Sequence, residues 1–128
     1  MMCLFLMQNI CSYFVQINSN LATSWAEATN TSNVKAGGAQ WHQWGLMCEI
    51  VISMDIIMPD AWTELKLATN LPSSRFGSGA RGIIQSQETG LAYCVIITSN
   101  GELFVRTDTH PQSDWYRGAI TYITTNPN

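Results

Sequence analysis

Residues 92–107 read AYCVIITSNGELFVRT, and this stretch carries the clearest sign of local structure in the chain. Two apolar runs flank the short polar segment Ser99-Asn-Gly101. Asn-Gly between two strands favours a two-residue type I′ turn, because both residues tolerate positive φ. The segment therefore predicts a β-hairpin with positive φ at Asn100 and at Gly101. The same turn predicts three facing pairs, which are Thr98 with Leu103, Ile96 with Val105 and Cys94 with Thr107.

The other face of this predicted hairpin is also largely apolar. There, Ile97 would face Phe104, and Val95 would face Arg106. A sheet with one solvated face usually carries more polar residues on that side. We therefore expect a sandwich of two sheets, in which the outer face of the hairpin meets another subunit.

Further strands lie on both sides of the hairpin in the sequence. Apolar residues alternate with polar ones from Leu46 to Ile56, which is typical of a half-buried strand. Shorter strands are predicted near residues 63–67, 80–87 and 117–124, with turn signals between them. The pattern predicts an all-β fold, an antiparallel sandwich of the jelly-roll type, without a helix after residue 30. The residues expected in the core are Leu46, Cys48, Ile50, Ile52, Leu65, Leu67, Ile96, Leu103, Val105 and Ile120.

The 128 residues fit one domain, with a head at residues 41–128 and an N-terminal extension at residues 1–40. The extension is expected to be either a stem or an edge strand. Its first 17 residues are apolar, but they lack the basic start of a secretory signal and the unbroken length of a membrane span, so no membrane insertion is expected. A helix with a short heptad seam and a strand both remain open here. The heptad positions are Leu4, Met7, Cys11, Phe14, Leu21 and Trp25.

Charged residues make up only 12% of the chain, against about 25% in a typical soluble protein. A surface with so little charge favours association, so part of it is expected to lie in an oligomer or to bind a partner. Together with the apolar hairpin, this predicts a homotrimer. The six Lys and Arg residues are scattered, and the net charge is −3. Binding to nucleic acid would require a basic stripe, which the sequence lacks.

The sequence offers little reactive chemistry. Its four cysteines lack the paired spacing of a zinc site, and Cys48 and Cys94 lie in apolar runs that predict small buried side chains. Whether two of the cysteines form a disulfide is left open at this point. Residues 77–82 match the dinucleotide pattern G-x-G-x-x-G, but β-branched residues follow them instead of a helix start, which favours a turn into a strand. No nucleophile motif is present, so we expect no enzyme activity, metal or cofactor.

Aromatic residues are the best candidates for ligand binding. Trp41 and His42 follow a glycine turn signal, and His110 and Asp114 lie in a polar loop over residues 107–114. Indole rings can stack on the C–H faces of sugars, and imidazole or carboxylate groups can hydrogen-bond hydroxyls. These four residues are the predicted contacts, although Trp41 and His42 could equally be packing residues. For Trp62 and Trp115, packing at an end of the sandwich is the favoured interpretation.

The second half of the chain contains a series of motifs in a fixed order, which are Trp62-Thr-Glu-Leu, Leu71-Pro-Ser-Ser-Arg-Phe76, Arg81-Gly, Val95-Ile-Ile-Thr-Ser-Asn-Gly-Glu-Leu103, Trp115-Tyr-Arg-Gly118 and Tyr122. Together they resemble the head domains of bacteriophage tail fibres and baseplate receptor-binding proteins. The resemblance covers about residues 44–124. It implies a homotrimer of β-sandwich heads, in a phage tail or in a prophage-encoded tail-like particle such as a bacteriocin. Surface saccharides are the usual receptors of that family, but its binding residues vary, so no residue's role is transferred.

Two hypotheses about function follow from these observations. The first is a virion or tail-like-particle protein that is made in the bacterial cytoplasm and attaches the particle to a host saccharide. The second is a purely structural tail or baseplate module that binds other virion proteins. Binding of glycans by the isolated protein would favour the first hypothesis over the second.

Overall fold

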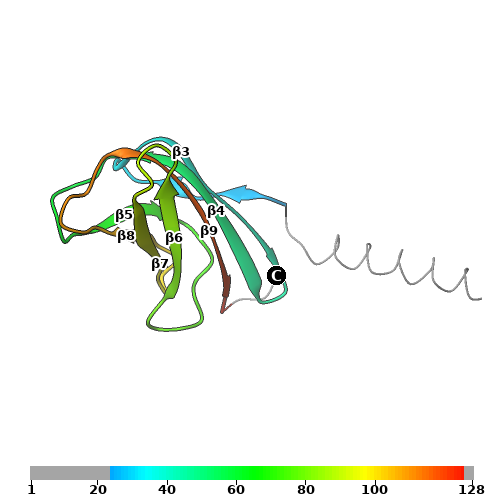
Figure 1. Ribbon diagram of the computed structural model, residues 1–128. Helices are drawn as coiled ribbons and strands as arrows, with labels where there is room; N and C mark the ends of the chain where they lie inside the picture. Colours follow the sequence, from blue (N-terminus) through cyan, green and yellow to red (C-terminus); the bar gives the residue numbers. More distant parts are fainter. Residues whose placement is uncertain (1–23, 126–128) are drawn as a thin grey trace, which may run out of the picture.

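The computed structural model describes residues 24–125 and confirms the all-β, antiparallel prediction (Figure 1). Nine strands form one continuous sheet, and the described residues contain no helix. The strands are β1 (Ala26–Glu27), β2 (Thr29–Asn30), β3 (Val34–Trp44), β4 (Met47–Ile56), β5 (Glu64–Thr69), β6 (Ala80–Ser86), β7 (Ala92–Ile97), β8 (Leu103–Arg106) and β9 (Asp114–Ile123).

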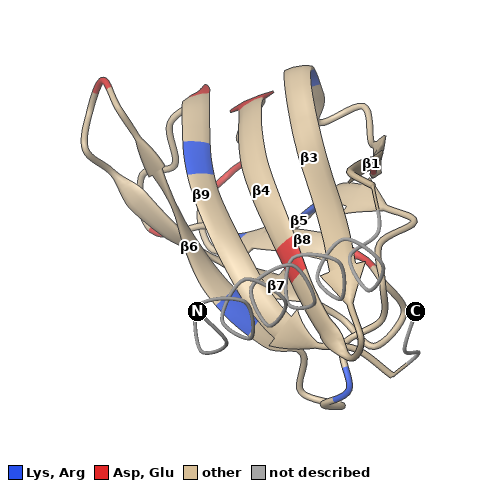
Figure 2. Cartoon of the chain, turned by 90° about the vertical axis from the view of Figure 1, so that its right-hand side faces the viewer, with Lys and Arg blue, Asp and Glu red and all other residues tan. Residues whose placement is uncertain are grey.

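The sheet bends back on itself and is nearly closed. Its order is β1-β3-β4-β9-β6-β7-β8-β5-β2, and Figure 2 shows β3, β4, β9 and β6 in front of β7, β8 and β5. Only Ala28 separates β1 from β2, so one short segment supplies both ends of this order. Beyond β2, Thr31 Oγ1 and Asn33 Nδ2 donate hydrogen bonds to the Lys66 carbonyl at 2.7 and 2.9 Å. These bonds tie the start of β3 to β5.

The core lies between the two halves of the bent sheet. The alternation predicted for β4 is confirmed, because Cys48, Ile50, Ile52, Met54 and Ile56 are all buried. Burial of each large aliphatic side chain contributes roughly 1.5–3 kcal/mol to stability. The residues that face them from the other half of the sheet are Leu67, Val95, Ile97, Leu103 and Val105.

The hairpin between β7 and β8 exists, but the predicted turn type and register are wrong. Only Gly101 has positive φ, at 74°, and its N–H donates to the Thr98 carbonyl at 3.1 Å. Thr98 N–H in turn donates to the Glu102 carbonyl at 2.9 Å, which closes a three-residue loop with a left-handed glycine at its end. The extra loop residue shifts the pairing of the two strands by one position. Each residue of β7 therefore pairs with the residue of β8 that precedes its predicted partner. The observed pairs are Val95 with Val105, Ile97 with Leu103, Ile96 with Phe104 and Cys94 with Arg106.

The observed register places four aliphatic residues of the hairpin on the inner face of the sheet. It also gives the outer face different pairs from those predicted. On the outer face, Ile96 is buried within the chain, and the Lys66 ammonium lies 5.7 Å from the centre of the Phe104 ring. Arg106 pairs with Glu64 through a hydrogen bond of 2.7 Å. The outer face of this hairpin is therefore not the exposed apolar surface that the predicted register implied.

Three further expectations about burial differ from the structure. Leu46 is 38% exposed because it lies in the turn between β3 and β4, one residue before the alternation of β4 begins. Trp62 is 74% exposed and has positive φ, so it extends from a loop and closes no end of the sheet. Leu65 is half-buried, since a register shift after Lys66 turns both Leu67 and Ala68 toward the core.

Strand β3 was not predicted, because its two adjacent glycines indicate a turn. Instead, Gly37 and Gly38 lie inside the strand, where the pairing with β4 shifts register between Val34 and Ala36. Gly37 has φ of 77°, and a Cβ there would overlap the carbonyl oxygen of Ser53 on β4. The sheet therefore includes residues 26–40, which the sequence assigned to the extension. The alternatives for residues 1–17 lie outside the described residues.

Candidate functional site

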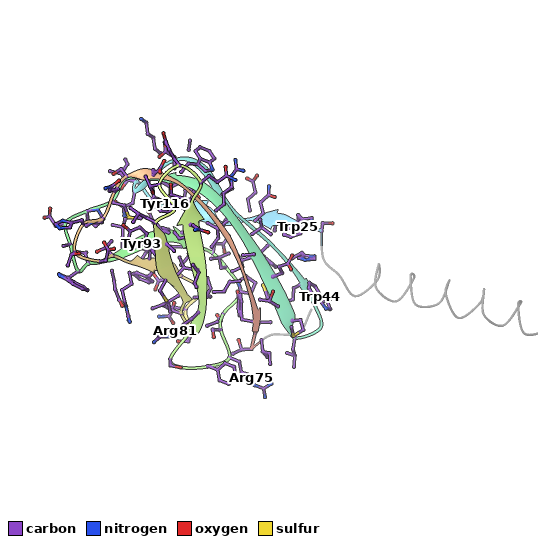
Figure 3. The ribbon with its side chains drawn as sticks, in the orientation of Figure 1. Trp25, Trp44, Arg75, Arg81, Tyr93 and Tyr116 are labelled. Atoms are coloured by element: carbon purple, nitrogen blue, oxygen red, sulfur yellow. The ribbon has the colours of Figure 1, made fainter. Side chains whose placement is uncertain are left out.

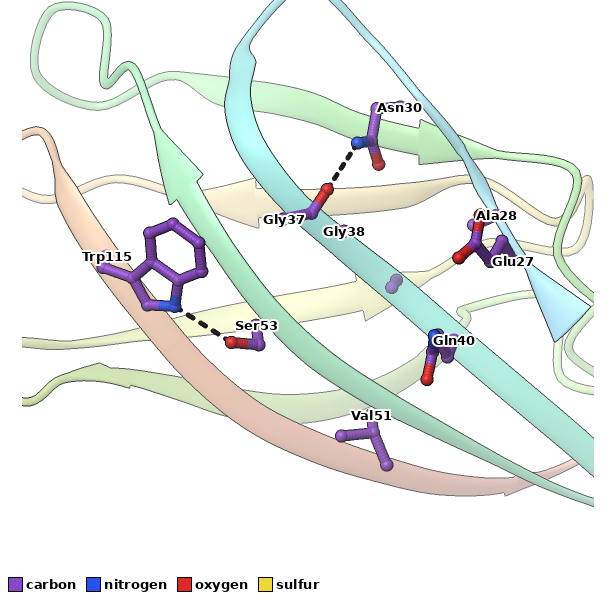
Figure 4. A pocket seen from close by; sticks show the side chains of 10 residues that line it. Glu27, Ala28, Asn30, Gly37, Gly38, Gln40, Val51, Ser53 and Trp115 are labelled. Atoms are coloured by element: carbon purple, nitrogen blue, oxygen red, sulfur yellow. Dashed lines mark hydrogen bonds between the residues drawn. The ribbon is translucent and has the colours of Figure 1, made fainter. Parts of the chain in front are cut away.

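A hollow of about 450 Å³ opens on the outer face of β3 and β4, a size within the range of ligand pockets (Figure 4). We call it the groove. Strand β1 and the side chain of Trp115 on β9 form its walls. Its lining residues are Glu27, Ala28, Asn30, Gly37, Gly38, Ala39, Gln40, Val51, Ser53 and Trp115.

The groove is hollow because small residues form its floor. Gly38 pairs with Ser53 across β3 and β4, so no large side chain stands above the sheet at this point. Two hydrogen bonds hold the neighbouring side chains, as the dashed lines in Figure 4 show. Asn30 Nδ2 donates to the Gly37 carbonyl at 2.8 Å, and Trp115 Nε1 donates to Ser53 Oγ at 2.9 Å. The indole is therefore fixed before any ligand arrives.

The polar groups of the groove stand in a row across the sheet. Glu27 on β1 pairs with Gln40 on β3, and Gln40 pairs with Val51 on β4. Both Glu27 and Gln40 are exposed. A carboxylate accepts hydrogen bonds and an amide both donates and accepts them. With the indole of Trp115 and the methyl groups of Val51 nearby, the groove can contact both the hydroxyl groups and the apolar faces of a ligand.

Next to the groove, three aromatic rings form what we call the aromatic cluster, made of Trp25, His42 and Trp44. The Trp25 and His42 rings are stacked, with centroids 4.0 Å apart and planes 21° apart. His42 also contacts Trp44 at 4.7 Å, and its Nε2 lies 3.4 Å from Oε1 of Glu49. Trp25 remains 50% exposed. Figure 3 shows Trp25 and Trp44 well away from the interior pair Tyr93 and Tyr116.

The groove and the aromatic cluster belong to one continuous surface. Alternate residues of a strand face the same side, so Gly38, Gln40, His42 and Trp44 share the outer face of β3. The chain at β1 supplies Glu27 to the groove and, two residues earlier, Trp25 to the cluster. Figure 2 shows few charged positions on the neighbouring strands of this face.

The structure separates the four predicted contacts. His42 lies in the aromatic cluster. Trp41 lies on the opposite side of β3, half-buried and packed against the core, with a buried Nε1 that has no hydrogen-bond partner among the described residues. Both residues belong to a strand, although the sequence placed them after a turn.

His110 and Asp114 lie toward the other end of the sheet. His110 is exposed, and its N–H donates to Asp108 Oδ1 at 3.1 Å. Asp114 begins β9 opposite Ile56, whereas Trp41 pairs with Ile50. Six residues of strand separate these two positions, which corresponds to roughly 20 Å. The structure therefore does not bring His110 or Asp114 to the aromatic cluster.

Asp114 has a structural role that its sequence position does not reveal. Its carboxylate accepts hydrogen bonds from Ser86 Oγ and from the N–H of Trp115. These bonds, above all the one from Ser86, hold the pKa of the Asp114 carboxyl below its ordinary value of 3.8. Ser86 Oγ also accepts hydrogen bonds from the N–H groups of Glu88 and Thr89, so Asp114 helps to fix the turn after β6.

The described cysteines are free thiols. Cys48 is buried, as predicted, and burial raises the pKa of its thiol above 9.0, which disfavours the reactive thiolate. Cys94 is only half-buried, on the outer face of β7. In residues 24–125, no three His, Cys, Asp or Glu side chains lie close enough to hold a metal ion.

Sequence reasoning missed most of the residues that line this surface. The sequence indicates Trp25 only as a heptad position, and it assigns no role to Glu27, Gln40, Glu49 or Ser53. The alternation from Gly38 to Trp44 could have placed four residues on one face, if residues 34–44 had been predicted as a strand. The pairing of β1 with β3 cannot be predicted from the local sequence pattern.

No family model, curated protein or solved structure matches the chain in the comparisons with known proteins. In the part of the chain that the structure describes, no helix has the length and apolarity needed to cross a membrane.

Proposed function

We propose that this chain is the receptor-binding head of a phage tail or tail-like particle and that it binds a host surface saccharide. The binding surface is the groove together with the aromatic cluster. The observation that carries the proposal is the stacked Trp25–His42 pair beside a groove that combines an indole, a carboxylate and amides. Sugars present both hydroxyl groups and apolar C–H faces, and this surface offers partners for both.

The position of the surface on strands supports the same proposal. Strands hold side chains more precisely than loops do, and preorganised contacts lower the entropy lost on binding. Ser53 and Glu49 lie on β4, whose inner face is completely buried. Their backbone is therefore fixed by the core.

Replacement of Trp25 by alanine tests the proposal. We expect the unaltered protein to bind saccharides on a glycan array and Trp25→Ala to weaken that binding at least tenfold, because a stacking surface is lost. Trp62→Ala is the matched control, since Trp62 is even more exposed but belongs neither to the groove nor to the aromatic cluster. Both variants should keep the melting temperature of the unaltered protein. Equal binding by all three proteins would contradict the assignment of the site.

A structural tail or baseplate module is the second candidate, and exposed apolar residues away from the groove favour it. Trp62 and Phe76 are both more than half exposed, as in a surface that packs against another protein. A protein that binds no glycan but binds a tail protein tightly would support this candidate. A homotrimer is compatible with both candidates.

A further inference from the structure

We infer that the ligand is a linear, uncharged oligosaccharide that lies along β3, and not a single sugar residue or an anionic polymer. The inference rests on the proposed function and names the class of ligand. It follows from the length of the binding surface, from the arrangement of its rings and from the charges around it.

The length of the surface requires more than one sugar unit. Gly38 lines the floor of the groove, and Trp44 lies at the far side of the aromatic cluster. The six residue steps between them correspond to roughly 20 Å of strand. A single sugar ring can occupy the groove or the cluster but not both. A chain of sugars laid along β3 can contact Trp115 at one end and Trp25 at the other.

The aromatic cluster is built to present a ring to a ligand. His42 contacts Trp25, Trp44 and Glu49, so it supports the Trp25 indole from behind. The other part of the Trp25 side chain is open, with 50% of its surface exposed. A supported, half-exposed indole provides a stacking platform at little entropic cost.

The charges on this surface disfavour anions. Glu27 lines the groove and Glu49 lies beside the aromatic cluster. Lys35 on β3 does not line the groove. Arg117 on β9 pairs with Ser53 of the groove floor, but it lines a separate hollow with Gln85 and Gly90. Placing a phosphate or uronate near two carboxylates is unfavourable, because like charges repel across an interface. Hydroxyl and N-acetyl groups face no such penalty.

The test uses the whole protein and defined oligosaccharides in titration calorimetry. The probes are neutral glucose and N-acetylglucosamine oligomers of one to six units, uronic-acid oligomers of the same lengths, and the neutral oligosaccharides that the array identifies. We expect affinity for the bound neutral series to rise at least tenfold between one and four units. Uronic-acid oligomers should bind at least tenfold more weakly.

Variants test the contributions of the groove and of the aromatic cluster to binding separately. Trp25→Ala should abolish the gain in affinity with length, whereas Gln40→Ala in the groove should weaken the binding of every length and keep that gain. Trp62→Ala should behave like the unaltered protein. Equal affinity for one and four units, or tighter binding of the uronic-acid series, would overturn the inference and leave the proposed function standing. If no saccharide binds on the array or in solution, the proposed function itself is wrong.

Discussion

The carboxylate of Asp114 illustrates how hydrogen bonds, above all one from a hydroxyl, lower the pKa of an acidic side chain in this protein. The hydrogen bond from Ser86 keeps the folded-state pKa of Asp114 below 3.8. A carboxyl with a depressed folded-state pKa stabilises the fold above its unfolded-state pKa, and that contribution is lost as the pH falls through the folded-state value. Below pH 3.8, therefore, the unaltered protein progressively loses this contribution.

Ser86→Ala removes the main cause of the shift, so we expect the pKa of Asp114 to rise toward 3.8 and acid unfolding to begin at a higher pH. The carboxyl resonance of Asp114 in NMR and the tryptophan fluorescence during acid titration measure the two effects. Ser113→Ala is the control, because Ser113 Oγ accepts a hydrogen bond from the Met58 N–H. An unchanged pKa of Asp114 in Ser86→Ala would show that the hydrogen bond does not set it.

A side chain at Gly101 would be unfavourable for two reasons, the positive φ of its backbone and the lack of space beside it. Gly90 shares only the first of these, so it separates the two effects. Gly101 has φ of 74°, and a Cβ there would overlap the Leu71 carbonyl oxygen. Gly90 has nearly the same φ, 76°, but no atom lies within 4 Å of where its Cβ would stand. We expect Gly90→Ala to lower the free energy of unfolding by about 1 kcal/mol and Gly101→Ala to lower it by at least about 2 kcal/mol. Urea unfolding measures both, and equal losses would mean that the overlap is relieved at no cost.

At the scale of the strands, local patterns predicted some elements and not others. Strand β4 could be predicted because apolar residues occupy every second position, with Glu49, Ser53 and Asp55 between them, and alternation is a local property. Strand β3 could not, since Gly37 and Gly38 indicate a turn unless the neighbouring strand is known. Their place inside a strand depends on the close approach of β4, which is a long-range contact.

The difference between local patterns and long-range contacts also explains which residues of the candidate site could be predicted. His42 could be identified because aromatic residues are dense around it. Its neighbours Trp25 and Glu49 lie 17 and 7 residues away along the chain and come together only through the pairing of β1, β3 and β4. The predicted turn and register of the hairpin were wrong for a local reason. Asn-Gly also fits a three-residue loop, in which only the glycine has positive φ.

At the scale of the whole molecule, one face of the bent sheet combines the groove with exposed apolar side chains. Val51 on β4 pairs with Ala119 on β9, which pairs with Ile83 on β6. All three are exposed, and Ile83 is 64% exposed. Exposed apolar side chains that lie side by side favour contact with a partner. In a trimeric head, these side chains would place a neighbouring subunit beside the groove.

We therefore expect the protein to be a homotrimer, with a mass three times that of the 14.2 kDa chain, in light scattering at micromolar concentration. Ile83→Glu should dissociate the trimer, because the interface would bury an unpaired charge, whose effective cost is several kcal/mol. The variant should stay folded, since Ile83 is exposed in the single chain. Ile57→Glu is the control, because Ile57 is 50% exposed but lies in the loop after β4, so that variant should remain trimeric. A monomeric unaltered protein would exclude the trimer, whereas a trimer that survives Ile83→Glu would place its interface on another surface.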